Sequence, residues 1–187
     1  MRPKVVRVLA EEFENLKLGL ILADMLVSIL PRLCFSRIRT AIYRLAGVDI
    51  GPRTLVLGRV TITGPGQAHR RLHIGADCII NAPLFLDLTG EIRIGDRVSV
   101  AHHSVFVTAH HDPGPPEFRA GANCGRPIMV GDGAWIATGV TILPGVTVGR
   151  SAILASGAVV AQDVAEDVLA GGVPARVIRQ LAGVAQS

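Results

Sequence analysis

Residues 130–165 read VGDGAW IATGVT ILPGVT VGRSAI LASGAV VAQDVA, and an aliphatic residue opens each group of six. A small or β-branched residue sits four positions later, as at Ala134, Val140 and Val146. The same period runs upstream with openers at Ile50, Val56, Ile62, Ile74, Ile80, Leu86, Ile94, Val100 and Phe106. A six-residue period is typical of a parallel β-helix, whose coils bury their apolar side chains by stacking. The sequence therefore predicts an all-β fold, a triangular prism with three six-residue faces per turn.

The composition agrees with stacked aliphatic coils. Hydrophobic residues make up 49% of the 187 residues, but aromatic residues only 4%, whereas a conventional core uses more aromatic area. The net charge of +4 favours anionic partners. The basic residues are scattered and lack interleaved aromatic residues, which argues against a nucleic-acid partner.

The cysteines point to a reducing compartment. Cys34, Cys78 and Cys124 are odd in number and far apart, and no CxxC pair occurs. This spacing argues against a zinc framework, so we expect no metal, and it favours the cytoplasm. Cys78 occupies a repeat position that elsewhere holds Val or Ala, so we expect a buried thiol.

Breaks in the repeat divide the chain into three parts. Residues 1–47 are predicted to be a helical segment broken by Pro31. Residues 48–165 are the predicted β-helix, with an extruded loop at 112–127 that is rich in Pro and Gly. Residues 166–187 are a predicted tail, with a short helix at 175–181. Loops that leave a regular solenoid often carry function.

The N-terminal segment allows two interpretations. Leu16 to Leu30 is strongly apolar but contains Lys17 and Asp24, so it is too short and too charged to span a membrane. It also lacks the pattern of a signal peptide. One interpretation is a helix packed on the prism or on a sister subunit. The other is a helix on the inner membrane face, assisted by Arg32, Arg37, Arg39 and Arg44.

Four short motifs follow one another in order: TAHH at 108–111, GAWI at 133–136, LPGV at 143–146 and GVPARVIR at 172–179. With the repeat, they resemble the hexapeptide-repeat O-acetyltransferases that use acetyl-CoA, which include galactoside, maltose and exopolysaccharide acetyltransferases. The similarity covers about Val48 to Leu181. It implies a left-handed β-helix, a homotrimer with its cleft between adjacent prisms, and direct transfer of acetyl to a carbohydrate hydroxyl without an acyl-enzyme. The acceptor class would be an exopolysaccharide, a glycan or a lipid-linked sugar.

The resemblance assigns the catalytic role to His111, at the end of the T-x-x-H motif. An imidazole within hydrogen-bond reach can take the proton of a sugar hydroxyl as it attacks the thioester. His110 is the competitor, but adjacent side chains of a strand face opposite ways, so only one of the two faces the cleft. Asp112 stands where galactoside-type relatives tend to have Pro, and it either orients the imidazole or begins the loop.

Two further residues are candidates for binding the acceptor. Asn81 matches a cleft-facing asparagine of the family, and an amide can both donate to and accept from a sugar hydroxyl. It can equally satisfy backbone groups inside a solenoid. Asp87 is the second candidate, since its repeat position also suits a polar residue in a turn. His102 and His103 are expected at an exposed corner, with a subunit contact as the alternative.

By resemblance, acetyl-CoA would bind along the late coils. Arg176 and Arg179 match a basic pair suited to the adenosine phosphates, or else they are solvated cations. Ala161 replaces a threonine of galactoside-type relatives, so a contact there would use backbone groups. The full set of expected cofactor-binding residues is Trp135, Thr138, Ser156, Ala161, Arg176 and Arg179.

Three other functions remain open from the sequence. The first is an acetyltransferase with another acceptor, such as an amino sugar, an antibiotic or serine. The second is a non-catalytic trimeric scaffold. The third is a metalloenzyme like the γ-carbonic anhydrases, which needs three converging histidines, whereas here no histidine follows His111.

Overall fold

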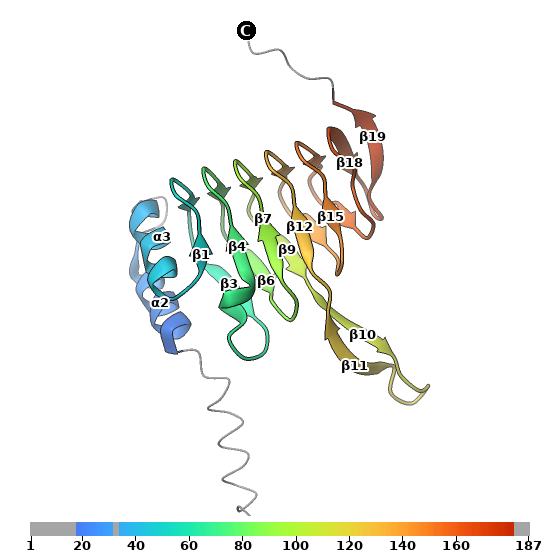
Figure 1. Cartoon of the computed structure of the whole chain (residues 1–187), viewed down its shortest axis with the longest axis horizontal. Helices are drawn as coiled ribbons and strands as arrows, with labels where there is room; N and C mark the ends of the chain where they lie inside the picture. Colours follow the sequence, from blue (N-terminus) through green and yellow to red (C-terminus); the bar gives the residue numbers. More distant parts are fainter. Residues whose placement is uncertain (1–17, 32–33, 182–187) are drawn as a thin grey trace, which may run out of the picture.

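The computed structural model describes residues 18–31 and 34–181, and its main body is a left-handed parallel β-helix (Figure 1). The first sheet contains β1 (Asp49–Ile50), β4 (Leu72–Ile74), β7 (Ile92–Ile94), β12 (Ile128–Val130) and β15 (Thr147–Val148). The second contains β2 (Leu55–Val56), β5 (Ile79–Ile80), β8 (Ser99–Val100), β13 (Trp135–Ile136), β16 (Ile153–Leu154), β18 (Val168–Gly171) and β19 (Arg176–Gln180). The third contains β3 (Val60–Thr63), β6 (Leu84–Asp87), β9 (Ser104–Val107), β14 (Thr141–Ile142) and β17 (Val159–Val160). We call the corner between the second and third sheets edge 2/3, and the corner between the third and first sheets edge 3/1.

The register confirms the predicted repeat. In the second sheet, Ile80 pairs with Val100, Val100 with Ile136, and Ile136 with Leu154. The openers are buried along the whole prism, apart from Ile62, which is half-buried. Cys78 is also buried, as its repeat position predicts. Stacking in register thus places the aliphatic side chains in one continuous core.

Helices α2 (Leu18–Ile29) and α3 (Ser36–Leu45) lie together at the N-terminal end of the prism (Figure 1). The buried Arg39 fixes their connection, because its guanidinium donates to the carbonyls of Pro31 and Cys34, each at 3.2 Å. The described part of the N-terminal segment is therefore helical as predicted. Residues 1–17, 32–33 and 182–187 lie outside the described residues, and with them Leu16, Lys17 and Arg32.

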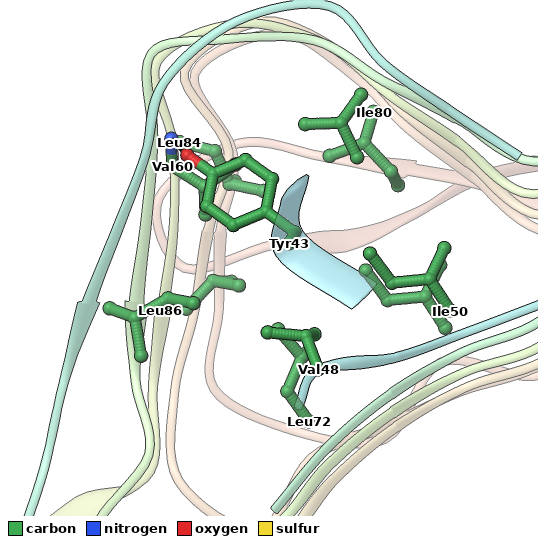
Figure 2. Close-up of a pocket in the computed structure, with 11 residues that line it drawn as sticks. Tyr43, Val48, Ile50, Val60, Leu72, Ile80, Leu84 and Leu86 are labelled. Carbon is green, nitrogen blue, oxygen red and sulfur yellow. Dashed lines mark hydrogen bonds between the residues drawn. The ribbon is translucent and has the colours of Figure 1, made fainter. Parts of the chain in front are cut away.

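Tyr43 of α3 closes this end of the core. Its ring points in among aliphatic side chains of the first two coils, as Figure 2 shows, and its hydroxyl accepts a hydrogen bond of 3.0 Å from the Val60 N–H. Burial raises the pKa of Tyr43. The small cavity beside the ring is lined by aliphatic residues, so it belongs to the core and offers nothing to orient a polar ligand.

The prediction of a C-terminal helix at 175–181 is wrong, because residues 176–180 form a strand. The chain makes a further coil strand, β18, beyond the predicted end at residue 165, and β19 then turns back antiparallel to it. An edge strand exposes backbone groups that seek partners, while a helix this short is marginal. The β-branched residues Val177 and Ile178 also favour a strand.

The predicted extruded loop is an ordered hairpin that leaves the prism earlier than residue 112. It consists of β10 (Ala109–Pro113) and β11 (Ala120–Gly125), with a turn between them. The proline- and glycine-rich composition indicated the break in the repeat, but it did not reveal the antiparallel pairing.

Candidate active site

The β10–β11 hairpin carries His111 away from the prism. It leaves edge 3/1 directly after β9 and projects outward (Figure 1). His110 pairs with Cys124 and His111 with Asn123, in antiparallel register. The two histidines therefore face opposite sides of the hairpin.

A buried carboxylate fixes the root of this hairpin. Asp87, at the end of β6, is 8% exposed, and its Oδ2 accepts a hydrogen bond of 2.6 Å from the Ala109 N–H. Its Oδ1 accepts from the Thr89 N–H at 3.0 Å and the Thr89 hydroxyl at 2.8 Å. The Thr108 hydroxyl adds a second tie, because it donates to the Asp87 carbonyl at 2.5 Å and accepts from the Gly90 N–H at 2.8 Å. The start of β10, the strand that carries His111, is therefore held to the end of β6 by hydrogen bonds of Asp87 and Thr108.

The exposed imidazole of His111 is oriented by a backbone carbonyl. Its Nδ1 lies 3.0 Å from the carbonyl oxygen of Gly121 on the facing strand. A carbonyl oxygen only accepts hydrogen bonds, so in this contact Nδ1 carries the proton. In the neutral ring Nε2 then holds the lone pair, which is the form that a general base requires.

His110 has different surroundings. It is half-buried, and its Nε2 lies 3.9 Å from Oδ1 of Asp112, beyond hydrogen-bond distance. Asp112 is exposed and belongs to β10. The contact that orients His111 is thus made by Gly121, and Asp112 lies beside the neighbouring histidine.

Three of the six residues expected to bind acetyl-CoA lie on the second sheet. Trp135 is half exposed on β13. It pairs with Ile153, Ile153 with Leu169, and Leu169 with Arg179 of β19. Paired residues share a face, so Trp135 and the exposed Arg179 lie in one outward row, about 14 Å apart at the usual strand spacing. Arg176 is also exposed, at the other end of β19.

Three other candidates line edge 2/3. Asn81 comes directly after strand β5, and Thr138 and Ser156 each stand two residues after the end of β13 and β16. The Asn81 side-chain amide donates to the Val100 carbonyl at 3.2 Å, and no donor among the described residues bonds to its oxygen. The Gly157 N–H donates to the Thr138 carbonyl at 2.9 Å, so this edge is tied from coil to coil.

The expected site residues therefore fall into two groups in one chain. The group along edge 3/1 comprises His111, Asp112, Asp87 and Ala161, which follows β17. The group on the second sheet and edge 2/3 comprises Trp135, Arg176, Arg179, Asn81, Thr138 and Ser156. The third sheet lies between the two edges, so a single chain does not bring the two groups together.

The groups that orient and hold His111 could not be predicted from the sequence. The Gly121 carbonyl is a backbone group, and no residue type encodes its role. Thr89 and Thr108 flank the end of a coil, where polar residues are common, so only the fold reveals that they serve Asp87.

The remaining histidines do not form a metal site. His102 and His103 are exposed at edge 2/3, as expected, with their ring centroids 5.4 Å apart. His73 lies on the first sheet between Asp49, at 2.8 Å, and Glu91, at 3.2 Å. Within residues 18–31 and 34–181, no group of three His, Cys, Asp or Glu side chains is arranged to hold a metal ion.

Comparison with known proteins agrees with this architecture. Residues 127–162 match the family described as bacterial transferase hexapeptide (six repeats). The chain is 31% identical over 144 residues to the "Putative colanic acid biosynthesis acetyltransferase WcaF" of Escherichia coli K12, an alignment that covers 77% of this chain and 75% of that protein. The chain belongs to the hexapeptide-repeat acetyltransferases.

Other hexapeptide-repeat acetyltransferases extend the comparison. The galactoside O-acetyltransferase of E. coli K12 is 37% identical over 112 residues, which cover 59% of this chain and 54% of that one. A solved Vibrio cholerae hexapeptide-repeat acetyltransferase, complexed with acetyl-CoA, superimposes with a TM-score of 0.74 at 27% identity and covers 91% of this chain and 90% of that one. The alignments with three of the curated relatives span between 46% and 63% of those proteins.

Proposed function

We propose that this chain transfers an acetyl group from acetyl-CoA to a hydroxyl of a carbohydrate, with His111 as general base. The observation that carries the proposal is the contact between His111 Nδ1 and the Gly121 carbonyl, which leaves Nε2 as the acceptor. Nε2 takes the hydroxyl proton while the oxygen attacks the thioester carbon. The C–S bond then breaks, the protonated imidazole returns the proton to the CoA sulfur, and no acyl-enzyme forms.

The proposed assembly is a homotrimer with the site between adjacent prisms. The two groups of site residues lie on different parts of one chain, so a neighbouring copy would have to supply the missing wall. Trp135, Thr138 and Ser156 of one subunit would then border the pantetheine arm, and His111 of the next would face the thioester. Ala161, beside the hairpin edge, would contribute through its backbone. Arg176 and Arg179 are exposed, and the Arg176 guanidinium donates to the Ala175 carbonyl at 2.9 Å with one of its nitrogens, so both side chains could bind the phosphates of the nucleotide.

The proposed acceptor is a glycan or a lipid-linked sugar. Two relatives are named for galactosides and for colanic acid biosynthesis, and both are carbohydrates. The Asn81 amide oxygen and the exposed Asp112 carboxylate are available to sugar hydroxyls, whereas both Asp87 oxygens are already bonded within the chain. Such an acceptor would place the protein at the cytoplasmic side of the inner membrane.

Transfer of label from [acetyl-14C]acetyl-CoA to a panel of oligosaccharide and lipid-linked sugar acceptors tests this function. His111→Ala is expected to lower kcat by a factor of about 10² to 10⁴ while CoA still binds. His110→Ala is the matched control, and it should retain most of the activity. Normal transfer by His111→Ala, or label appearing on amines instead of hydroxyls, would refute the proposal.

A further inference from the structure

Helix α2 presents an uncovered apolar face at the end of the prism. Its opposite side, with Ala23 and Val27 each 3% exposed, is buried against the body of the protein. The outward residues recur every three or four positions, so they form one stripe. Their exposed fractions are large: Leu18 62%, Ile21 44%, Leu22 58%, Met25 59%, Leu26 53% and Ile29 76%.

Helix α3, which contacts α2, also exposes apolar side chains. Phe35, just before the helix, is 52% exposed, Ile38 50% and Leu45 89%. We refer to the stripe on α2 together with these three residues as the α2–α3 surface. Monomeric proteins rarely leave a large apolar stripe such as that on α2 uncovered, so a partner is expected to cover it.

The charges around the α2–α3 surface are one-sided. Among the described residues between Leu18 and Val48, Arg37 and Arg44 are exposed, Arg39 is buried, and the one acid is Asp24. The Asp24 carboxylate is already neutralised, because both of its oxygens accept hydrogen bonds of 2.5 Å from Arg59. Arg37 is exposed beside Ile38. An anionic partner would therefore meet a cation and no unpaired acid in the described part of these helices.

We propose that the α2–α3 surface binds the anionic surface of a lipid bilayer, with α2 lying in the plane of the interface. α2 has 12 residues, and no helix in the described part of the chain is long and apolar enough to cross a membrane. An apolar stripe flanked by arginine is the pattern of a helix that lies on lipid. The stripe itself is aliphatic, whereas protein interfaces depend more on Trp, Tyr and Arg anchors. This inference does not rest on the proposed acetyl transfer, since lipid binding needs neither acetyl-CoA nor an acceptor.

Cosedimentation of the full chain with vesicles tests the proposal. Vesicles of phosphatidylcholine with phosphatidylglycerol should bind the protein, and vesicles of phosphatidylcholine alone should bind it much less. The double variant Leu22→Gln/Leu26→Gln should reduce partitioning into the vesicles by about tenfold or more, because two leucine side chains no longer insert into the lipid. Ser28→Gln, an exposed change on the same helix that leaves the stripe intact, is the matched control.

The charge of Arg37 is tested separately. Arg37→Gln should weaken binding to the anionic vesicles by about fivefold, and Arg150→Gln, at the far end of the prism, should not.

Three results would overturn the proposal. The wild-type protein could stay in the supernatant with both vesicle types. The leucine double variant could bind as the wild type does, which would assign lipid binding, or coverage of the stripe, to another segment such as residues 1–17. Sedimentation velocity without lipid could show that the double variant dissociates a wild-type assembly, which would make the surface a contact between copies of this chain.

Discussion

The Asp87 carboxylate accepts a hydrogen bond of 2.6 Å from the backbone N–H of Ala109, two residues before His111. This contact joins the end of one coil to the start of the hairpin that carries the proposed base. The carboxylate is buried, and its second oxygen is held by Thr89. Both carboxylate oxygens are thus bonded within the chain, and in the proposed mechanism Asp87 would act by holding β10 in position.

Asp87→Asn should therefore impair catalysis and stability together. An amide replaces one acceptor oxygen by a donor, so a buried N–H loses its partner, which costs about 1–3 kcal/mol in the free energy of unfolding. Thermal denaturation measures that loss, and kcat should fall while KM for acetyl-CoA stays near its wild-type value. Asp96→Asn is the control, because half-buried Asp96 also accepts a backbone N–H, that of Ala76 at 2.7 Å, but lies at the corner between the first and second sheets and not at the hairpin edge. Equal effects of the two substitutions on kcat would contradict a positioning role.

The core beneath the hairpin offers a matched pair of phenylalanines. Phe106 is fully buried in β9, whereas Phe85 lies on the neighbouring strand β6 and is 37% exposed. Phe106→Ala should lower the free energy of unfolding by about 3–5 kcal/mol, through lost burial and the cavity left behind. Phe85→Ala should cost much less. Urea denaturation of both variants measures the difference, and similar losses would mean that the core is not organised around Phe106.

The three thiols should differ in reactivity. Burial raises the pKa of Cys78, and its thiol donates to the carbonyls of Gly95 at 3.1 Å and Ala76 at 3.4 Å. Iodoacetamide at neutral pH should therefore modify exposed Cys34 long before Cys78, as mass spectrometry of peptides would show. Rapid modification of Cys78 in the folded protein would contradict its burial.

The raised pKa of Cys78 also predicts how the free energy of unfolding changes with pH. The folded state holds the thiol proton to higher pH than the unfolded state does, so its contribution is complete below the unfolded pKa of about 8.5 and is lost as pH rises beyond it. Cys78→Ala should reduce this alkaline loss in denaturation curves between pH 7 and 10. If the free energy of unfolding falls with pH as steeply in the variant as in the wild type, other groups cause the alkaline loss of stability.

The outward row on the second sheet predicts an effect on cofactor binding. Arg179→Ala should raise KM for acetyl-CoA by about tenfold, the loss expected for one charge-assisted contact to phosphate, and leave kcat close to wild type. Arg93→Ala is the control, since Arg93 is an exposed cation on the first sheet. Steady-state kinetics with acetyl-CoA varied would distinguish the two. Unchanged KM in the Arg179 variant would remove β19 from the proposed cofactor site.

The six-residue period predicted the prism from the sequence because every coil repeats the same local rule. An opener such as Ile136 must point inward wherever it occurs, and its burial follows. The C-terminal strand was not predicted, because β19 forms in response to the free edge of β18 and its own residues are also compatible with a helix. Pairing across an edge is a tertiary effect that a local pattern does not contain.

The candidate site divides in the same way. His111 and Trp135 stand in motifs, so the sequence indicates them directly. The partner of His111 is the Gly121 carbonyl, which becomes its neighbour only when the hairpin closes. The division of the expected site between edge 3/1 and the second sheet also needs the structure, since both groups are interleaved along the chain.

In the proposed assembly, His111 of one subunit and Trp135 of another border the same site. Mixing separately inactive His111→Ala and Trp135→Ala proteins, unfolding them together and refolding them tests it most directly. Random assembly would rebuild some sites with both residues intact, and acetyl transfer should return to as much as about one quarter of the wild-type rate per site. If the mixture stays as inactive as its two components, while wild-type protein treated in the same way recovers, the site does not lie between subunits and the account is contradicted.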